Sequence, residues 1–298
     1  MTLRAVLCAA LWGAVAAAPG EARAADPRVV TLGGAVTETA FALGAGTALV
    51  GVDDTSMFPA AARALPKVGY FRNVAAEGIA SLRPDRVIAG AGSGPQAALG
   101  QLEQLGMRVV ALPEAFDAAA ALERVRLIGT ALGRDAAAQA LLAGMREDLD
   151  QVAAALAGAK SEPRVLFLLG AGRGAPMASG GRTAADAMIR LARARNAVEG
   201  FVGYKALNPE SAVAAAPDVI LTTRETLEAL GSSEALLRLP ELAQTRAARA
   251  GRLVALDGVY LLGFGPRLAH ALRDLAAALH PELRMPTLRQ RAWVEAAR

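Results

Sequence analysis

The chain has 298 residues, of which 54% are hydrophobic, and it carries a formal net charge of +4. This length is enough for two domains with substantial cores. The basic residues are mostly scattered arginines, the lysines being Lys67, Lys160 and Lys205, and no basic run is interleaved with aromatic residues. The composition therefore gives little support to nucleic-acid binding. No stretch beyond the N-terminus is apolar for long enough to span a bilayer.

The first 24 residues are typical of a secretory signal peptide. Arg4 supplies a positive charge, residues 5–18 are apolar, and Ala22-Arg23-Ala24 is a small-x-small cleavage site. We therefore expect a mature chain that starts at Ala25, is exported to the periplasm and is not inserted in the membrane.

Cysteine usage agrees with this expectation. Cys8 is the only cysteine, and it lies in the predicted signal peptide. The mature protein would then have no disulfide, no cysteine-ligated zinc and no cysteine nucleophile.

Apolar runs alternate with helical segments in the first part of the mature chain. The predicted strands and helices are, in order, Arg28–Leu32, helix Thr37–Leu43, Leu49–Val52, helix Glu77–Leu82, Val87–Ala89, helix Leu99–Leu105 and Val109–Leu112. Strands that alternate with helices at this spacing indicate a mostly parallel sheet with helices on its faces.

Residues 117–159 are rich in Ala, Leu, Gln, Glu and Arg, which favour helix. Gly133 divides them, and Asp135–Ala157 predicts one helix about 35 Å long at 1.5 Å per residue. We interpret it as a connector between two domains. A coiled coil is the alternative, although its mostly alanine apolar positions keep no clean heptad.

The pattern of strands and helices restarts after this helix. The predicted elements are strand Arg164–Leu169, a glycine-rich loop at 170–181, a helix at 184–194 capped by Thr183, a helix ending at Ala216, strand Pro217–Leu221, strand Arg252–Leu256, a loop at 260–266, a helix from Pro266 to Leu279, and a tail from Pro281 that is irregular or a short helix.

The two halves repeat each other at an offset of 133 to 134 residues. Gly69-Tyr70 matches Gly203-Tyr204, and Glu77 and Glu210 each lie seven residues before a Pro-Asp pair. Such a repeat indicates an internal duplication. We expect a signal peptide at 1–24, an N-terminal lobe at 25–134, a connecting helix at 135–159 and a C-terminal lobe at 160–298. A ligand would lie between the lobes, where strand-end loops converge.

Enzyme motifs are only approached. The glycine-rich segments 90–95 and 170–175 do not fit G-x-G-x-x-G, and 176–183 has Pro and Arg where a P-loop needs Gly and Lys. No G-x-S-x-G is present. His270 and His280 are ten residues apart and share no helix face in the i, i+4 sense, so we interpret them as surface or capping residues rather than metal ligands.

The run Gly69-Tyr70-Phe71-Arg72, on a predicted loop, contains one of the chain's three tyrosines beside an arginine. Tyrosine is a hard anionic oxygen ligand for some haem irons, and a neighbouring arginine favours the phenolate. A loop tyrosine that packs its ring on Pro66 is the simpler interpretation, and spacing does not decide between the two.

Glu77 and Glu210 hold matching positions, each at the start of a predicted helix. A first-turn carboxylate stabilises a helix through its dipole, which needs no further function. A symmetric pair of acidic residues, one on each lobe, would also suit a partner with twofold symmetry.

The chain resembles the periplasmic haem-binding proteins of bacterial haem ABC importers, which belong to the helix-linked class of substrate-binding proteins. The resemblance covers nearly the whole mature chain. The segments that carry it are 65–72, 76–78, 176–178, 183–188, 203–205, 222–224 and 261–267. It implies a class III periplasmic binding protein, an α/β fold in which two Rossmann-like lobes with mostly parallel sheets are joined by one long connecting α-helix.

The resemblance also implies residue roles. Tyr70 would be the axial ligand of ferric haem b, Arg72 would hold the phenolate, and Arg224 would reach the ligand tyrosine or a propionate from the second lobe. The apolar walls of the cleft would include Met57, Phe58, Met177, Tyr204, Tyr260, Leu262 and Phe264.

The same resemblance implies the partners. Haem would be the transported ligand, with no catalytic cofactor, and Glu77 and Glu210 would dock a monomeric carrier on an inner-membrane permease dimer with its ATPase. A siderophore or corrinoid carrier of the same class is one alternative. A secreted Rossmann-like enzyme is the other.

One departure from the family predicts the stoichiometry. Some relatives have a histidine in the glycine-rich loop of the second lobe that ligates a second, stacked haem, whereas this chain has Ala171. A titration of the mature protein with hemin, followed by visible absorption, should therefore saturate at one equivalent. Saturation at two equivalents would contradict this interpretation of Ala171.

Overall fold

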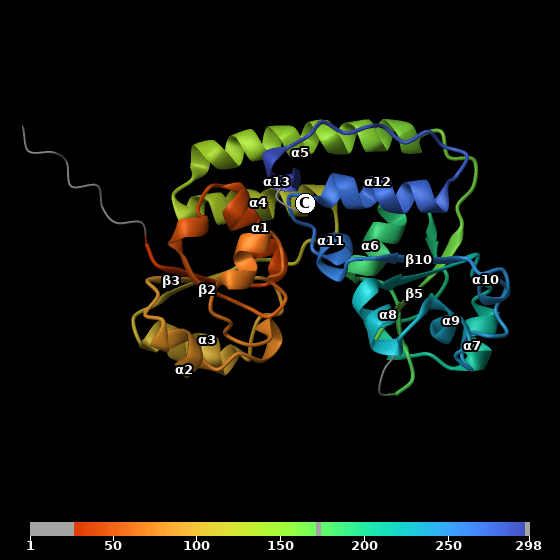
Figure 1. Ribbon diagram of the computed structural model, residues 1–298, viewed down its shortest axis with the longest axis horizontal. Coiled ribbons are helices and arrows are strands. Elements are labelled where there is room, and N and C mark those ends of the chain that lie inside the picture. Colours follow the sequence, from red (N-terminus) through yellow and green to blue (C-terminus); the bar gives the residue numbers. More distant parts are fainter. Residues whose placement is uncertain (1–26, 171–173, 296–298) are drawn as a thin grey trace, which may run out of the picture.

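Two separate β-sheets organise the chain, one on each side of a molecule with two lobes (Figure 1). The structure is a computed structural model that describes residues 27–170 and 174–295. The predicted signal peptide with Cys8, and the position Ala171, lie outside the described residues. Within them, no helix is long and apolar enough to cross a bilayer.

The first sheet is entirely parallel and has the strand order β2-β1-β3-β4. Its strands and the helices near them are β1 (Val29–Leu32), α1 (Gly34–Ala42), β2 (Leu49–Val52), α2 (Ala76–Ser81), β3 (Arg86–Ala89), α3 (Gln96–Gln104) and β4 (Arg108–Ala111). Alternate residues of one strand enter different cores, because Val29 packs with α1 and Val30 packs with α2 and α3. Burial on both faces explains why these strands are continuous apolar runs.

The second sheet is mixed, with the order β10-β9-β5-β6-β8 and with β7 also paired to β5. The strands that pair in parallel are β5 (Arg164–Leu169), β7 (Arg195–Asn196), β9 (Val219–Thr223) and β10 (Leu253–Leu256). Strand β6 (Met177–Ser179) pairs antiparallel with β5 on one side and with β8 (Tyr204–Ala206) on the other. The predicted α/β class with mostly parallel sheets is confirmed. The expectation of a loop throughout 170–181 is wrong, since β6 lies within it. A three-residue strand is too short to show a period in sequence.

The duplication is visible in backbone detail. Order β7-β5-β9-β10 of the second sheet repeats order β2-β1-β3-β4 of the first. The Asp85 carboxylate accepts a 2.8 Å bond from the backbone N–H of Arg28, and the Asp218 carboxylate accepts a 2.9 Å bond from that of Arg164. Arg83 and Ala216, two residues before these aspartates, both adopt positive φ, at 47° and 43°. The same local conformation at the same offset indicates one ancestral unit.

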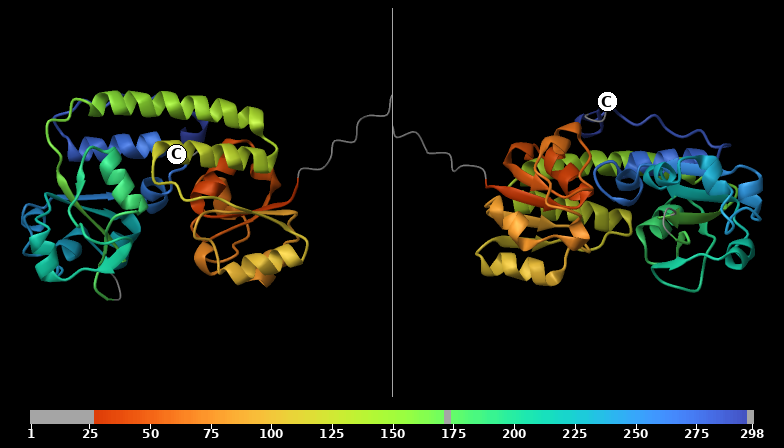
Figure 2. Two further views of the ribbon diagram at one scale, coloured as in Figure 1. Left: turned by 180° about the vertical axis from the view of Figure 1, so that it is seen from behind. Right: turned by 60° about the horizontal axis from the view of Figure 1, so that its bottom comes forward.

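Two consecutive helices lie between the two sheets in the chain, and the second of them joins the lobes. Asp117 caps α4 (Ala118–Leu132) by accepting a 2.7 Å bond from Ala120 N–H, and Gly133, at φ 66°, ends it. Helix α5 (Asp135–Leu156) then runs along both lobes (Figures 1 and 2). Its residues Leu141 and Met145 belong to the core of the first lobe, whereas Leu149 and Val152 belong to that of the second. One rigid helix therefore contributes to two cores.

The C-terminal segment crosses back from the second lobe to the first. After α12 (Leu268–Leu279) the chain runs beside α5 to the short α13 (Ala292–Glu295), which contacts α1 (Figure 1). Arg291 is held on α5 by Asp148 at 2.8 Å and Glu147 at 2.7 Å. The Trp293 ring covers Gly144, where a Cβ would lie 2.8 Å from a ring atom. This segment is a second tie between the lobes.

Both histidines are buried, so a surface position is wrong for either, whereas the capping interpretation fits His280. His280 is the C-cap residue of α12, and its Nε2 lies 2.8 Å from the carbonyl oxygen of Ala192. Burial lowers the pKa of His270, which favours the neutral ring. Their burial was not visible in sequence because residues that contact them are distant along the chain.

A buried ion pair joins the lobes directly. Arg267, which precedes α12, donates two 2.9 Å hydrogen bonds to Glu38 of α1. The side chains are 12% and 3% exposed. The guanidinium also lies 3.7 Å from the ring centroid of Phe58, in the first lobe, and 5.0 Å from that of Tyr260, in α11 (Gly258–Leu262). Helix α11 occupies the start of what was predicted as a loop.

A second arginine, on the first lobe, binds backbone of the second lobe. Arg124 of α4 donates a 2.8 Å hydrogen bond to the carbonyl oxygen of Phe264 and another to that of Gly263. Burial lowers the pKa of Arg124 to about 10. A buried arginine on each side thus fixes the lobes where they meet.

Replacing Glu38 with alanine should lower the free energy of unfolding by about 3 kcal/mol, because it leaves the buried Arg267 unpaired. Chemical denaturation followed by circular dichroism measures the change. Glu123→Ala, which breaks an exposed pair with Arg126, is the matched control and should leave the midpoint unchanged. Equal midpoints for the two variants would contradict a stabilising role of the Glu38–Arg267 pair.

Candidate functional site

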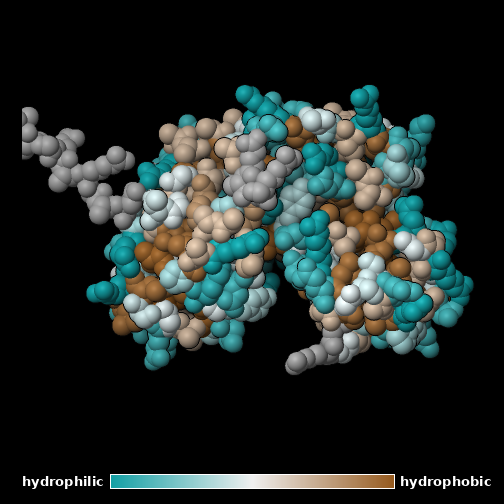
Figure 3. Space-filling view, in the orientation of Figure 1, coloured by the Kyte–Doolittle hydropathy of each residue, from teal (hydrophilic) through white to brown (hydrophobic). Residues whose placement is uncertain are grey.

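A cleft separates the lobes and opens on the side opposite α5 (Figure 3). The loop after β3 and the start of α8 (Arg224–Leu230), directly after β9, follow strands at their carboxyl ends. In open α/β sheets, ligands bind outside this end of the strands. The cleft is therefore the candidate site.

Tyr70 stands on a loop that is held by the backbone. Asp54 N–H donates a 3.0 Å hydrogen bond to the carbonyl of Gly69, whose φ of 92° turns the chain into the loop. Tyr70 then begins a 3₁₀ turn, because its carbonyl accepts a 2.8 Å bond from Asn73 N–H. Its ring is 4.9 Å from that of Phe71, edge to face, and the side chain remains 47% exposed. The tyrosine is thus positioned by its backbone and open to a ligand.

Arg72 is held on the other side of Phe71. Its guanidinium lies 5.0 Å from the Phe71 ring centroid. It also lies against Gly92 in the loop after β3, where a Cβ would come within 2.9 Å of Nη1. That loop is fastened to the Tyr70 loop by the 2.9 Å bond from Gly94 N–H to the Phe71 carbonyl. Tyr70 and Arg72 therefore share one rigid corner, and Gly92 leaves room for the cation.

Tyr204 faces this corner from the second lobe. It begins β8, opposite Ser179 of β6, and its ring lies 6.5 Å from that of Phe167 in an edge contact. Burial raises the pKa of Tyr204, while the nearby hydroxyls of Thr183 and Ser179 and the positive charge of Arg72 act in the opposite direction. The charge of Arg72 thus reaches Tyr204 from the other lobe.

Arg224 is the first residue of α8, which borders the gap between the lobes (Figure 1). The Thr223 hydroxyl caps the helix by accepting a 3.2 Å bond from Thr226 N–H. The Arg224 side chain is exposed. Among the described residues, no hydrogen bond or ion pair joins it to Tyr70 or Arg72.

The predicted cleft walls fall into three groups. Met57, Met177 and Leu262 are exposed or half-buried. Phe58 and Tyr260 stack on Arg267 where the lobes meet, and the Tyr260 hydroxyl donates a 2.8 Å bond to Asp274, a contact that with burial raises its pKa. Phe264 is 1% exposed and lies in the core of the second lobe, so it does not line the open cleft.

Glu77 and Glu210 lie at corresponding places on the two lobes. Each is in the first turn of a short helix, α2 or α7 (Pro209–Ala214), and each side chain is exposed. Both helices lie on the side of the molecule away from α5, where the cleft opens (Figures 1 and 3). In the described ranges, no hydrogen bond or ion pair involves either carboxylate.

The sequence did not single out Gly92, Ser179 or Thr183 as neighbours of the site. Gly92 lies in a glycine-rich run of the sequence. That run is the signal that could have indicated it, because a residue without a side chain leaves room for another side chain, here that of Arg72. Thr183 was recognised only as a helix cap, and Ser179 only fell within the predicted loop, because their approach to Tyr204 depends on the β6–β8 pairing.

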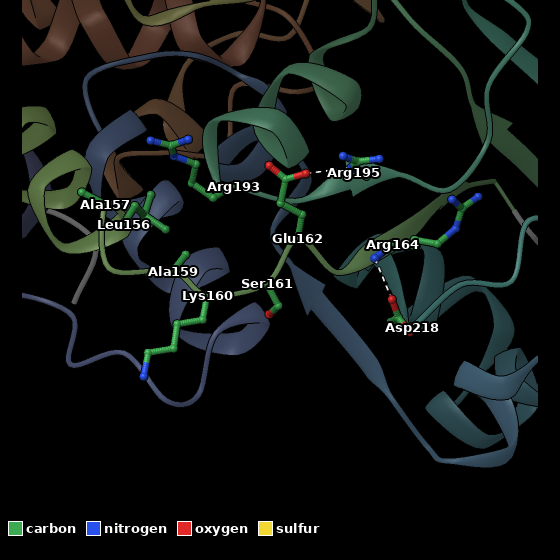
Figure 4. A pocket seen from close by; sticks show the side chains of 10 residues that line it. All are labelled: Leu156, Ala157, Ala159, Lys160, Ser161, Glu162, Arg164, Arg193, Arg195 and Asp218. Atoms are coloured by element: carbon green, nitrogen blue, oxygen red, sulfur yellow. Dashed lines mark hydrogen bonds and ion pairs between the residues drawn. The ribbon is translucent and has the colours of Figure 1, made fainter.

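A second concavity lies at the opposite end of β5 (Figure 4). It has a volume of roughly 650 Å³ and charged lining residues. Glu162 pairs with Arg195 at 2.7 Å, and Asp218 accepts a bond from the backbone of Arg164. It lies at the amino end of the strand, away from the strand ends where ligands bind in open α/β sheets, so it is not the candidate site.

Comparisons with known proteins agree on one family. The periplasmic binding protein family matches residues 29–260. Two solved structures are the periplasmic heme-binding protein BhuT in complex with two hemes, 44% identical with a TM-score of 0.81 over 86% of this chain and 98% of that one, and RhuT from Roseiflexus sp. RS-1, a periplasmic heme-binding protein in apo form, 37% identical with a TM-score of 0.82 over 86% and 99%. An ABC transporter substrate-binding lipoprotein of Bacillus subtilis, YvrC, which is uncharacterised, is 27% identical over 86% of this chain and 80% of that protein.

These findings place the chain in a family. It belongs to the periplasmic binding proteins, and the match covers strands of both lobes. The expectation of a binding protein rather than an enzyme is confirmed by this membership.

Proposed function

We propose that this periplasmic binding protein holds haem between its lobes and delivers it to an inner-membrane ABC transporter. The observation that carries the proposal is the partly exposed Tyr70, which packs on the same Phe71 ring as Arg72, in a chain similar to haem-binding proteins over most of its length. Haem is the transported ligand and takes part in no reaction here.

Tyr70 binds the ferric iron through its phenolate oxygen. A free tyrosine has a pKa of about 10, so a phenolate at neutral pH needs positive charge nearby. The ferric ion and Arg72 supply that charge. Arg72 suits this role because it is a fixed cation whose planar fork matches oxygen anions. Phe71 and the Gly92 loop hold it in place before the ligand arrives.

Arg224 acts from the second lobe. It is exposed at the start of α8, on the side of the cleft opposite Tyr70, and makes no competing contact with Tyr70 or Arg72 in the described structure. It binds a propionate or the ligand phenolate when haem occupies the cleft. Met57, Met177 and Leu262 contribute apolar surface for the porphyrin.

Delivery uses the exposed tips of both lobes. Glu77 and Glu210 are exposed, related by the internal duplication, and on the side where the cleft opens. They dock a monomeric carrier on arginines of a permease dimer with twofold symmetry, which its ATPase drives. Docking at this side presents the cleft opening to the permease. The first 24 residues direct export to the periplasm.

The number of haems bound follows from the glycine-rich loop. BhuT was solved with two hemes. Ala171 provides no imidazole for a second iron in this chain. We therefore propose one haem per chain, and the hemin titration tests this stoichiometry.

Tyr70→Phe should abolish the ferric-phenolate absorption of the hemin complex and weaken hemin binding by more than about tenfold, because only the oxygen is lost while the ring still packs on Phe71. Arg72→Ala should weaken binding by about 10- to 100-fold, as partners of metal ligands do. Visible absorption titrations measure both effects.

An unchanged spectrum and affinity in Tyr70→Phe would remove the ligand role of Tyr70. Cyanocobalamin and a ferric siderophore are the control ligands for the wild-type protein. Binding of either in place of hemin would favour the alternative carriers of the same class.

Replacing both Glu77 and Glu210 with alanine should leave hemin affinity unchanged and reduce haem-dependent growth of a strain that relies on this importer, because the exposed carboxylates contact only the permease. Glu103→Ala, which removes another carboxylate from the first lobe, is the control. Normal growth of the double variant would rule out docking through these residues.

A further inference from the structure

Tyr204 is the counterpart of Tyr70 in the second lobe, yet its surroundings differ. Each follows a glycine with positive φ, 92° at Gly69 and 82° at Gly203, so the chain enters both positions through the same kind of turn. Tyr70 packs on its own loop, whereas Tyr204 packs on Phe167 of the central strand β5 and is 36% exposed. The two tyrosines therefore have the same origin and different environments.

The environment of Tyr204 keeps its hydroxyl protonated. Burial raises its pKa, and this effect outweighs the influence of Thr183, Ser179 and Arg72. Ser179 and Thr183 are buried and hydrogen-bonded to each other at 2.5 Å, so they form a fixed polar floor beside the hydroxyl. A protonated phenol donates one hydrogen bond. Tyr204 is thus a neutral donor rather than an anionic iron ligand.

The opposite side of the cleft supplies a cation. Arg72 lies close enough for its charge to act on Tyr204, although it belongs to the other lobe. A guanidinium has five N–H donors, so Arg72 is able to serve the Tyr70 phenolate and a second oxygen anion. A neutral donor, with a cation near enough for its charge to act on it, matches an anionic oxygen of the ligand.

We propose that Tyr204 donates a hydrogen bond to a carboxylate of the bound porphyrin, next to Arg72, and so makes the site selective for porphyrins with free carboxylates. This inference rests on the proposed function, because it assumes a porphyrin between the lobes. Tyr70 then binds the iron, and Tyr204 binds a carboxylate at the edge of the macrocycle.

The test compares two ligands on two proteins. Ferric protoporphyrin IX has two carboxylates, and its dimethyl ester has none that are free. Tyr204→Phe removes the hydroxyl and keeps the ring on Phe167. It should weaken binding of the diacid by about tenfold, as expected for a hydrogen bond to a charged group, and change the dissociation constant of the diester by less than about twofold. The ferric-phenolate absorption should be unchanged, since Tyr70 is intact.

Lys205→Met is the matched control. Lys205 is the next residue of β8, so its side chain points to the other face, where it lies 4.9 Å from the Phe201 ring centroid. This variant should keep the ratio of the two dissociation constants at the wild-type value. Equal thermal midpoints for Tyr204→Phe and wild type confirm that both are folded.

The outcomes separate the two proposals. An equal loss for diacid and diester, or no loss for the diacid, would overturn the role of Tyr204 and leave haem binding in place. A wild-type protein that binds neither porphyrin would overturn the proposed function, and this inference with it.

Discussion

The apolar face of α5 is divided between two hydrophobic cores, and the arrangement of the molecule depends on this division. Leu141 and Met145 pack in the first lobe, and Leu149 and Val152 pack in the second. Neither core is complete without the helix, so each lobe is attached to the same rigid rod. The buried Glu38–Arg267 pair adds a direct contact below it. The C-terminal segment, which Arg291 holds on α5, is a further contact between the lobes. Helix α5, the ion pair and this segment together limit how far the cleft changes shape.

The two lobes bring different side chains to the site. Each lobe is built on a sheet of its own, and each half of the duplication carries one partly exposed tyrosine at a matching position. Divergence after duplication then distinguished the walls: Tyr70 received a cation at two residues' distance, and Tyr204 received a buried polar floor. A flat, two-faced ligand with a central metal and acidic edges fits such a pair of unlike walls.

Much of the fold was predictable from the sequence because the patterns that indicate it are local. The strand Leu49–Val52 and the strand Arg164–Leu169 were placed to the residue, since buried parallel strands are apolar runs bounded by polar residues or turns. Tyr70 was singled out as a candidate because tyrosine is rare here and an arginine follows two residues later. The Glu38–Arg267 contact was not predictable, because 229 residues separate its members. Phe264 was misjudged for a related reason: its burial depends on segments that only the tertiary fold brings together.

A crystal structure of the protein with ferric haem would test the central claim most directly. The account predicts a porphyrin between the two lobes, with its iron bonded to the phenolate oxygen of Tyr70 and with Arg72 beside that oxygen. A porphyrin bound outside the cleft, or an iron in the cleft with no bond to Tyr70, would contradict it.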